Sequence, residues 1–247
     1  DNIGKKSSDL TKFLSSETDG VFYTGHASIL VRLNKKKYLF DYINNTNFYR
    51  NSWIFFPNQI IDKRLYNVDG VFVSHIHQDH YDPALLRKFQ RKGVPIYILN
   101  GRENFKKALK KEKLKVNLIP VKKKTFISNN TWVYGCLHEY NDIDSSLVIS
   151  NNNLSVYHGN DNFITEKSLI PFKKKVGSID VGCIPFAYIN YYPYLLNGIS
   201  NKQNKSEARR LENLFMDYGI KQSKILKPKI IIPFGSNLFH IDNPKCA

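Results

Sequence analysis

The chain has 247 residues, of which 42% are hydrophobic, and it carries a formal net charge of +16. This length can bury a substantial core, and this composition excludes a disordered or fibrous protein. No apolar stretch reaches the roughly 18–20 residues that a membrane helix needs, and the first ten residues lack the apolar core of a signal peptide. We therefore expect a globular protein without a membrane span.

The cysteines and the lysines give weaker information. Cys136, Cys183 and Cys246 are odd in number, lie far apart and form no CxxC, which argues against a disulfide framework and favours a cytoplasmic location. Cys183 lies in the apolar run VGCIPF and is expected to be a small core residue. The positive charge is spread over scattered lysine runs and accompanied by abundant asparagine. It reflects either a compositional bias or attraction of an anionic substrate.

The first half of the chain predicts strands followed by an α/β layer. Strands are expected at 21–25, 28–33, 37–41, 69–74 and 95–99, and helices at 82–93 and 103–113. The run 69–74 is continuously apolar, as in a strand buried on both faces. Asp82 is a plausible N-cap of its helix, Pro83 fits the first turn, and Gly93 ends it. Strand, helix, strand and helix in this order indicate an α/β layer.

The second half predicts another series of short strands, at 124–128, 131–136, 145–150 and 154–159. The clearest helix covers 206–220, with Ser206 as its cap and with Ala208, Leu211, Leu214, Phe215 and Tyr218 on one face. Residues 229–234 predict a final buried strand. We interpret residues 1–247 as a single domain of two similar halves, packed sheet against sheet.

The stretch SHIHQDH (74–80) carries the strongest chemical signal. It contains three of the seven histidines of the chain and directly follows a predicted buried strand. Two histidines two positions apart in an extended segment can point the same way, and Asp79 and His80 can turn toward a second point. Imidazole and carboxylate together suit zinc, iron or manganese, so the spacing predicts a site for two neighbouring metals.

This string resembles the signature of the metallo-β-lactamase superfamily. The resemblance implies an α/β fold, the four-layer αββα sandwich of two mixed β-sheets flanked by helices. It also implies two divalent metal ions, zinc in the first place, with manganese or iron as alternatives. The implied ligands are His75, His77 and His138 for one metal, Asp79, His80 and His240 for the other, and Asp161 as the bridge. Asp161 competes with His158 and Asp180, while His240 competes with Asp242 or contacts the substrate instead.

Residues upstream resemble one branch of this superfamily. TGHASILV (24–31) and YLFDY (38–42) are similar to the opening of ascorbate-phosphate lactonase-like proteins and N-acyl-phosphatidylethanolamine phospholipases. This implies that Asp41 accepts a hydrogen bond from a metal-bound histidine or from its loop. His26 either faces the site or is an ordinary structural histidine. The tail PKIIIPFGSNLFHIDN also resembles the metallo-β-lactamase-type domain of CMP-N-acetylneuraminate hydroxylase.

Two aromatic segments are candidates for the rim of the site. Tyr188, Tyr191 and Tyr192 lie in PFAYINYYPYL, and Arg50 lies in FYRNSWIFFPNQ. Tyrosine has an apolar ring and a polar hydroxyl, which suits a pocket wall and equally suits loop packing. We predict these four residues as substrate contacts.

The leading functional prediction is a metal-dependent hydrolase that acts on a small anionic molecule, a phosphoester or a lactone. Asp79 would orient the attacking water, and His240 would assist the leaving group. An oxygen-dependent di-iron oxidoreductase on the same fold is the alternative, since sequence does not separate zinc from iron here. A nuclease ranks lower, because the chain shows no room for a large inserted nucleic-acid-binding domain. A metal-free binding protein is the most remote alternative. The oligomeric state is not indicated.

Overall fold

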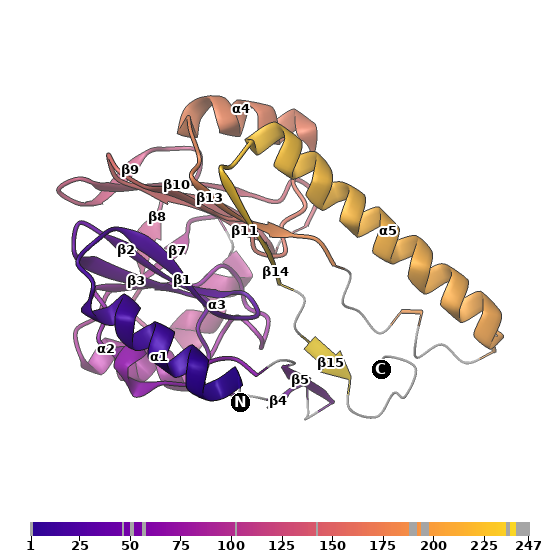
Figure 1. Ribbon diagram of the computed structural model, residues 1–247, viewed down its shortest axis with the longest axis horizontal. Helices are drawn as coiled ribbons and strands as arrows, with labels where there is room; N and C mark the ends of the chain where they lie inside the picture. The colour runs from indigo at the N-terminus through magenta and orange to yellow at the C-terminus, as the bar shows by residue number, and fades with distance from the viewer. Residues whose placement is uncertain are drawn as a thin grey trace.

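The computed structural model describes residues 2–45, 47–49, 52–55, 58–101, 103–141, 143–187, 192–193, 198–235 and 238–240. Two six-stranded sheets pack face to face, and helices cover the outer face of each (Figure 1). This is the four-layer αββα sandwich that the sequence predicts.

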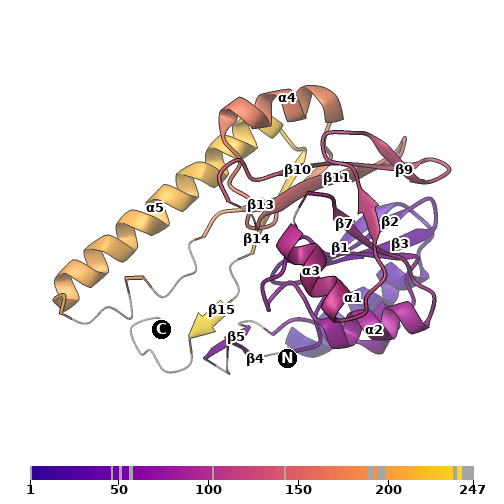
Figure 2. The same ribbon diagram turned by 180° about the vertical axis from the view of Figure 1, so that it is seen from behind.

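The first sheet is built from the N-terminal half of the chain. Its strands, in spatial order, are β1 (Gly20–Gly25), β2 (Ser28–Leu33), β3 (Lys36–Phe40), β6 (Gly70–Phe72), β7 (Ile96–Leu99) and β8 (Asn117–Ile119). The first three pair antiparallel, and the run from β3 to β8 is parallel. Helices α1 (Asn2–Ser15), α2 (Pro83–Arg91) and α3 (Glu103–Lys111) cover its outer side (Figure 2). A short 3₁₀ helix, η1, spans Lys63–Tyr66.

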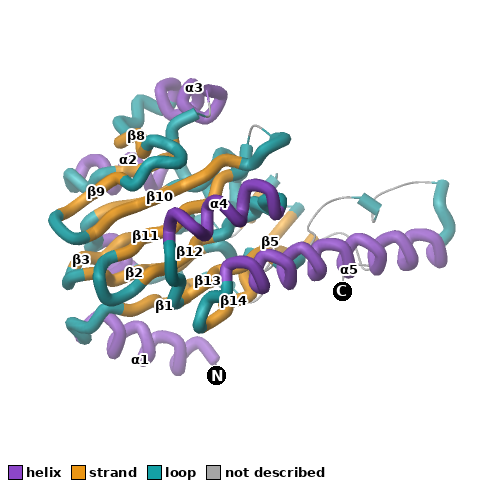
Figure 3. The backbone as a smooth tube through the Cα atoms, turned by 90° about the horizontal axis from the view of Figure 1, so that it is seen from above, coloured by secondary structure: helices purple, strands orange, loops and turns teal. Residues whose placement is uncertain are grey.

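The second sheet and the two C-terminal helices form the other half. Its strands, in spatial order, are β14 (Ile230–Phe234), β13 (Val181–Pro185), β12 (Ser155–His158), β11 (Ser145–Ser150), β10 (Thr131–Leu137) and β9 (Thr125–Ser128). Helices α4 (Glu166–Val176) and α5 (Asn201–Leu226) lie on its outer face, and α5 runs on well past the sheets (Figure 3). A small third sheet has the order β15 (Leu238–His240), β5 (Trp53–Phe55) and β4 (Asn47–Phe48).

The space between the two large sheets is filled by apolar side chains from both. Phe40 and Phe72 stack with ring centroids 4.6 Å apart, and Ile149 and Cys183 from the facing sheet belong to the same buried cluster. Cys183 is fully buried, as its apolar neighbours in the sequence predict. Burial of this apolar surface is the main force that holds the two sheets together.

The capping signals predict one helix correctly and misplace the start of another. The Asp82 side chain accepts a hydrogen bond from the Leu85 amide, and Pro83 occupies the first turn of α2, as predicted. Helix α5 (Asn201–Leu226), however, begins five residues before the predicted cap. Its cap is Ser200, which forms a reciprocal capping box with Gln203, so the assignment of Ser206 as cap is wrong.

One expectation about burial is also wrong. Strand β14 is neither fully buried nor final. It lies at the edge of its sheet with Ile230 and Ile231 about half exposed, and β15 follows it.

Helices α1 and α4 are absent from the sequence prediction. Helix α1 precedes the first predicted strand, and Leu10 anchors it in the core beside the half-buried Phe13. Helix α4 contains Pro171, a residue that normally argues against a helix interior. No helix among the described residues is both long and apolar enough to cross a membrane.

Gly159 sits where β12 passes so close to β13 that no side chain fits. A Cβ atom there would lie 2.6 Å from the Cys183 carbonyl oxygen and 2.7 Å from Pro185 Cδ. We expect Gly159→Ala to lower the free energy of unfolding by about 1–3 kcal/mol, because the backbone must shift. Thermal unfolding monitored by circular dichroism measures this. Asn152→Ala, at an exposed position in the turn before β12, is the control, and equal midpoints for the two variants would contradict the close approach.

Candidate metal centre

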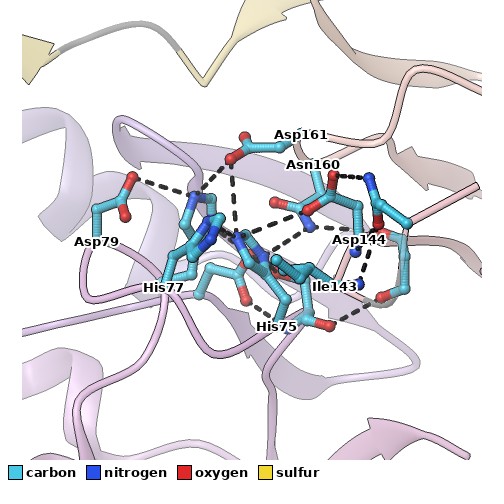
Figure 4. A network of polar contacts seen from close by, with 12 residues as sticks. His75, His77, Asp79, Ile143, Asp144, Asn160 and Asp161 are labelled. Carbon is cyan, nitrogen blue, oxygen red and sulfur yellow. Dashed lines mark hydrogen bonds and ion pairs between the residues drawn. The ribbon is translucent and has the colours of Figure 1, made fainter. Parts of the chain in front are cut away.

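The predicted metal-binding loop lies where strands from both sheets end. Residues 75–80 follow β6, Asp41 follows β3, and Asp161 follows β12 of the opposite sheet. Because β3 and β6 are parallel neighbours, their carboxyl ends meet at one edge of the first sheet. Figure 4 shows Asp161 approaching His75 and His77 from the segment after β12.

The buried carboxylate of Asp41 orients two of the histidines. Its Oδ1 accepts a hydrogen bond from the Ser74 amide (2.8 Å), and its Oδ2 accepts from Ser74 Oγ (2.5 Å) and from His80 Nδ1 (3.0 Å). Ser74 Oγ in turn lies 3.0 Å from His75 Nδ1 and can accept its proton. His80 therefore carries a proton on Nδ1 and directs Nε2 into the site, and Ser74 ties the orientation of the His75 ring to the same carboxylate. The predicted orienting role of Asp41 has the geometry it requires.

One group of potential ligands contains His75, His77 and Asp161. Their ligand atoms all lie within 4.8 Å of one another. His75 Nε2 is 2.7 Å from His77 Nδ1 and 3.8 Å from Asp161 Oδ2. These three residues, two from the loop after β6 and one from the facing sheet, thus converge on one point.

A second group contains His26, Asp79 and His80, and it adjoins the first. Asp79 Oδ2 accepts from His26 Nε2 (3.1 Å) and lies 3.3 Å from His80 Nε2. Asp161 Oδ2 is also 3.3 Å from His80 Nε2, so this carboxylate connects the two groups as a bridging ligand would. The sequence predicts His26 either as a site residue or as a structural histidine, and in the structure it contacts the site directly.

The charges of these groups show why a cation fits. Burial alone would lower the pKa of His80, but the carboxylates of Asp161 and Asp79 outweigh it and raise this pKa well above its usual value. For Asp161, burial acts to raise the pKa, yet the neighbouring His80 lowers it to about 2. His75 is different, because burial and the His80 charge lower its pKa to about 3. The two carboxylates therefore favour a positive charge at His80, between them, while His75 beside it stays neutral.

His80 Nε2 provides a direct test of fit for a metal. This nitrogen is buried and has no hydrogen-bond partner, while its lone pair points between two carboxylates. A lone pair that faces two anions is unfavourable unless a proton or a metal ion lies among them. Imidazole nitrogens and carboxylate oxygens are suitable ligands for zinc, iron and manganese, so the residues present fit a divalent metal.

The two alternatives to Asp161 as the bridging ligand, His158 and Asp180, lie away from the site. His158 is buried between Phe40 and Phe234, and its Nε2 contacts the Ala27 carbonyl oxygen, which identifies a structural histidine. Asp180 accepts from the Ser155 amide and pairs with Lys229 at the far end of β12 and β13.

The other predicted site residues are less closely placed. His138 lies on the wall of the adjoining cavity but in neither ligand group. The His240 backbone pairs with Trp53 in the third sheet, and its side chain is outside the described residues, as are Arg50, Tyr188, Tyr191 and Asp242. Tyr192 is described, and its hydroxyl donates to Glu207 on the surface. The structure therefore does not bring Tyr192 to the described cavity wall.

Several residues at the site have no signal in the sequence. Tyr49 donates from its hydroxyl to Asp79 Oδ1 (3.2 Å), and burial together with the Asp79 charge raises its pKa. Asn160 places its amide 3.1 Å from His75 Nδ1. Asp144 places Oδ1 3.9 Å from His75 Nε2. Only the position of Asn160 beside Asp161, at the end of a predicted strand, could have drawn attention to it.

A cavity of about 800 Å³ opens beside the two ligand groups. His77, Asp79 and Asp161 lie on its wall, and apolar residues from the segment after β12 and from α5 form much of the rest. Phe163, Phe215 and Tyr218 contact one another there, with ring centroids 4.6–6.1 Å apart; we call them the aromatic wall. Lys221 is the only lysine or arginine among the described residues that line the cavity.

Comparison with known proteins agrees with this architecture. Residues 20–203 match the family described as the beta-lactamase superfamily domain. The fold is similar to that of Igni18, a metallo hydrolase from Ignicoccus hospitalis, with a TM-score of 0.59 and 15% identity over 89% of this chain and 83% of that one. It is also similar to CmlA, a diiron β-hydroxylase from Streptomyces venezuelae, with a TM-score of 0.57 and 17% identity over 90% of this chain and 45% of that one. At these identities the likeness shows the fold alone.

A shorter match exists in sequence. A protein of Mycolicibacterium smegmatis, named as a Rieske 2Fe-2S iron–sulfur protein, is 34% identical over 76 residues, or 30% of this chain. The match spans only 14% of that relative's length.

Replacement of Asp41 tests the hydrogen bonds that orient His75 and His80. In Asp41→Asn an amide nitrogen replaces one carboxylate oxygen, so at least one of the three hydrogen bonds is lost and the charge disappears. We expect metal affinity to fall about 10–100-fold, as for other residues that orient metal ligands. Competition with a chromophoric chelator measures the dissociation constant. Asp69→Asn is the matched control, because the Asp69 side chain accepts from the Lys37 amide, at the other end of β3 from the site. Equal losses in both variants would contradict a specific role for Asp41.

Proposed function

This chain belongs to the metallo-β-lactamase superfamily, and we propose that it is a hydrolase that holds two divalent metal ions between the two sheets. The observation that carries the proposal is the convergence of two adjacent ligand groups that share the carboxylate of Asp161. When bound, such ions lower the pKa of water and stabilise negative charge that develops on the substrate. Zinc, manganese and iron all suit these ligands.

The residues of the chain would bind and orient the reactants. Asp79 lies on the cavity wall and is held by His26 and Tyr49, so its carboxylate is fixed toward the position of an attacking water. Tyr49 uses its one hydroxyl proton on Asp79 Oδ1, so its part is to hold this carboxylate in place beside the cavity. A role for His240 in assisting the leaving group stays a proposal that rests on the sequence.

The cavity points to the kind of substrate. The aromatic wall and the aliphatic residues beside it favour a molecule with an apolar portion, and Lys221 favours a negative group one helical turn beyond Tyr218. We propose a small anionic phosphoester or lactone with an apolar substituent. A nucleic acid is disfavoured, because only one lysine lines the described cavity, whereas phosphate backbones require several cationic contacts.

A di-iron oxidoreductase is the second candidate. His75, His77 and Asp161 combine two histidines with one carboxylate, and this is the set that non-haem iron oxygenases use. The diiron β-hydroxylase with a similar fold shows that the fold can carry such chemistry in another protein.

Elemental analysis of protein purified without added metal separates these two functions. Two zinc or manganese ions per chain, with turnover of nitrophenyl phosphoesters or lactones that does not need oxygen, are expected for the hydrolase. Two irons with a visible absorption band and no hydrolysis would instead favour the oxidoreductase.

His77→Ala tests the loop that supplies the first ligands. We expect loss of at least one metal ion per chain and of activity, with an unchanged circular dichroism spectrum, because His77 provides a nitrogen to the His75 group. Lys88→Ala, on the solvent side of α2, should retain both metal and activity. Full metal content and full turnover in His77→Ala would overturn the assignment of this loop.

Phe215→Ala tests the aromatic wall. For a series of nitrophenyl phosphodiesters whose second ester group grows from methyl to phenyl, we expect kcat/KM to fall by about 10-fold or more for the phenyl ester and little for the methyl ester. This follows from the roughly 1.5–3 kcal/mol that burial of a large apolar side chain contributes. Leu214→Ala, on the neighbouring exposed position outside the cavity, is the control. Equal effects on both esters would contradict a binding role.

A further inference from the structure

The loop between β10 and β11 brings two potential ligands to the same side of the site. His138 and Asp144 stand at its two ends, joined by a hydrogen bond from the His138 amide to the Asp144 carbonyl oxygen (2.9 Å). Both side chains line the cavity. The resemblance to the superfamily assigns the metal-binding role to His138, but the contacts of the two residues differ in a way that reverses this choice.

The hydrogen bonds of His138 oppose metal binding through its other nitrogen. Its Nδ1 accepts from the backbone amides of Tyr140 (3.0 Å) and Asn141 (3.1 Å). In a neutral imidazole with an accepting Nδ1, the proton is on Nε2, so Nε2 has no lone pair to offer. His80 shows the opposite arrangement in the same site, because its Nδ1 donates to Asp41 and its Nε2 lone pair faces the carboxylates. Metal-binding histidines have the His80 arrangement.

Asp144 is held in a position that suits a ligand. Asn141 donates from Nδ2 to Asp144 Oδ2 (2.8 Å), which holds the carboxylate, and its Oδ1 accepts from the Asp144 amide (2.9 Å), which holds the backbone that carries it. The other oxygen, Oδ1, lies 3.9 Å from His75 Nε2. Figure 4 shows Asp144 and Asp79 on opposite sides of His75 and His77, with Asp161 between them.

The distance is compatible with a shared cation. Two atoms that each bind one metal at about 2.1 Å stand roughly 3.0–3.5 Å apart. Asp144 Oδ1 and His75 Nε2 are wider apart than this, and Asp144, like His138, lies outside the compact group of His75, His77 and Asp161, so its side chain would have to move inward to bind the same ion. The side chain of Asp144 is only 14% exposed, so a charged carboxylate there is stabilised by a cation beside it.

We propose that Asp144, and not His138, completes the metal ligands beside His75, His77 and Asp161. The proposal rests on the metal-dependent function proposed above and specifies its ligands. Two imidazoles with two carboxylates form a harder ligand set than three imidazoles, which shifts preference toward manganese or iron relative to zinc. His138 then keeps its Nε2 proton and serves as a hydrogen-bond donor on the cavity wall.

Matched substitutions at both ends of the loop test this assignment. Asp144→Asn keeps the shape of the side chain and an oxygen for Asn141 but removes the charge. His138→Asn keeps an acceptor for the two backbone amides but removes the imidazole. Glu139→Gln is the control, because Glu139 lies in the same loop and bonds Thr165 instead of the site. Metal content per chain, the Mn²⁺ dissociation constant from calorimetry, and the visible spectrum of Co²⁺-loaded protein are measured for each variant.

We expect Asp144→Asn to weaken Mn²⁺ binding by at least about 10-fold and to alter the Co²⁺ spectrum, while His138→Asn and Glu139→Gln match the unsubstituted protein. The opposite pattern, with loss in His138→Asn and none in Asp144→Asn, would overturn the proposal. Equal losses in both would also overturn it, because the loop as a whole would then control binding. An unsubstituted protein that binds no metal would refute the proposed function itself, which is a different result from failure of the ligand assignment.

Discussion

The site depends on one buried anion, the carboxylate of Asp41. It accepts from the Ser74 amide and hydroxyl and from His80, and through Ser74 it also reaches His75. A buried carboxylate is costly unless it is fully hydrogen-bonded, so these contacts stabilise one arrangement of the loop after β6 against all others. The same contacts place a proton on Nδ1 of His80. The fold and the chemistry of the site therefore meet at this residue.

The site residues that sequence reasoning found are those that lie in a short, dense motif. SHIHQDH follows directly after β6, and the structure gathers His75, His77, Asp79 and His80 with Asp161. Asp144 and Tyr49 were not predicted, because each is a single polar residue in a loop with no motif around it. Asp144 comes close to His75, and Tyr49 to Asp79, only through the packing of elements that are distant in the sequence. His138 shows the reverse problem. Its residue type fits the family pattern, yet two backbone amides determine its protonation.

The fold was predictable where local chemistry agrees with packing. The Asp82 cap, the continuous apolar run of β6 and the short strands of the second half all indicate the elements that form. Prediction failed where tertiary contacts override local preference. Helix α4 accommodates Pro171, and α1 is held by Leu10 in a buried cluster. The exposed isoleucines of β14 show that an apolar run also forms the edge of a sheet.

The ligand groups draw on both halves of the sandwich, since His75 to His80 follow β6 of the first sheet while Asp161 follows β12 of the second. A cation held by residues from both sheets would act as a crosslink between the two halves. Its binding free energy would then add to the work needed to separate them, by RT ln(1 + [L]/Kd) for a ligand that binds the folded state alone. Resistance to heat and to proteolysis would consequently vary with the supply of metal in the surroundings.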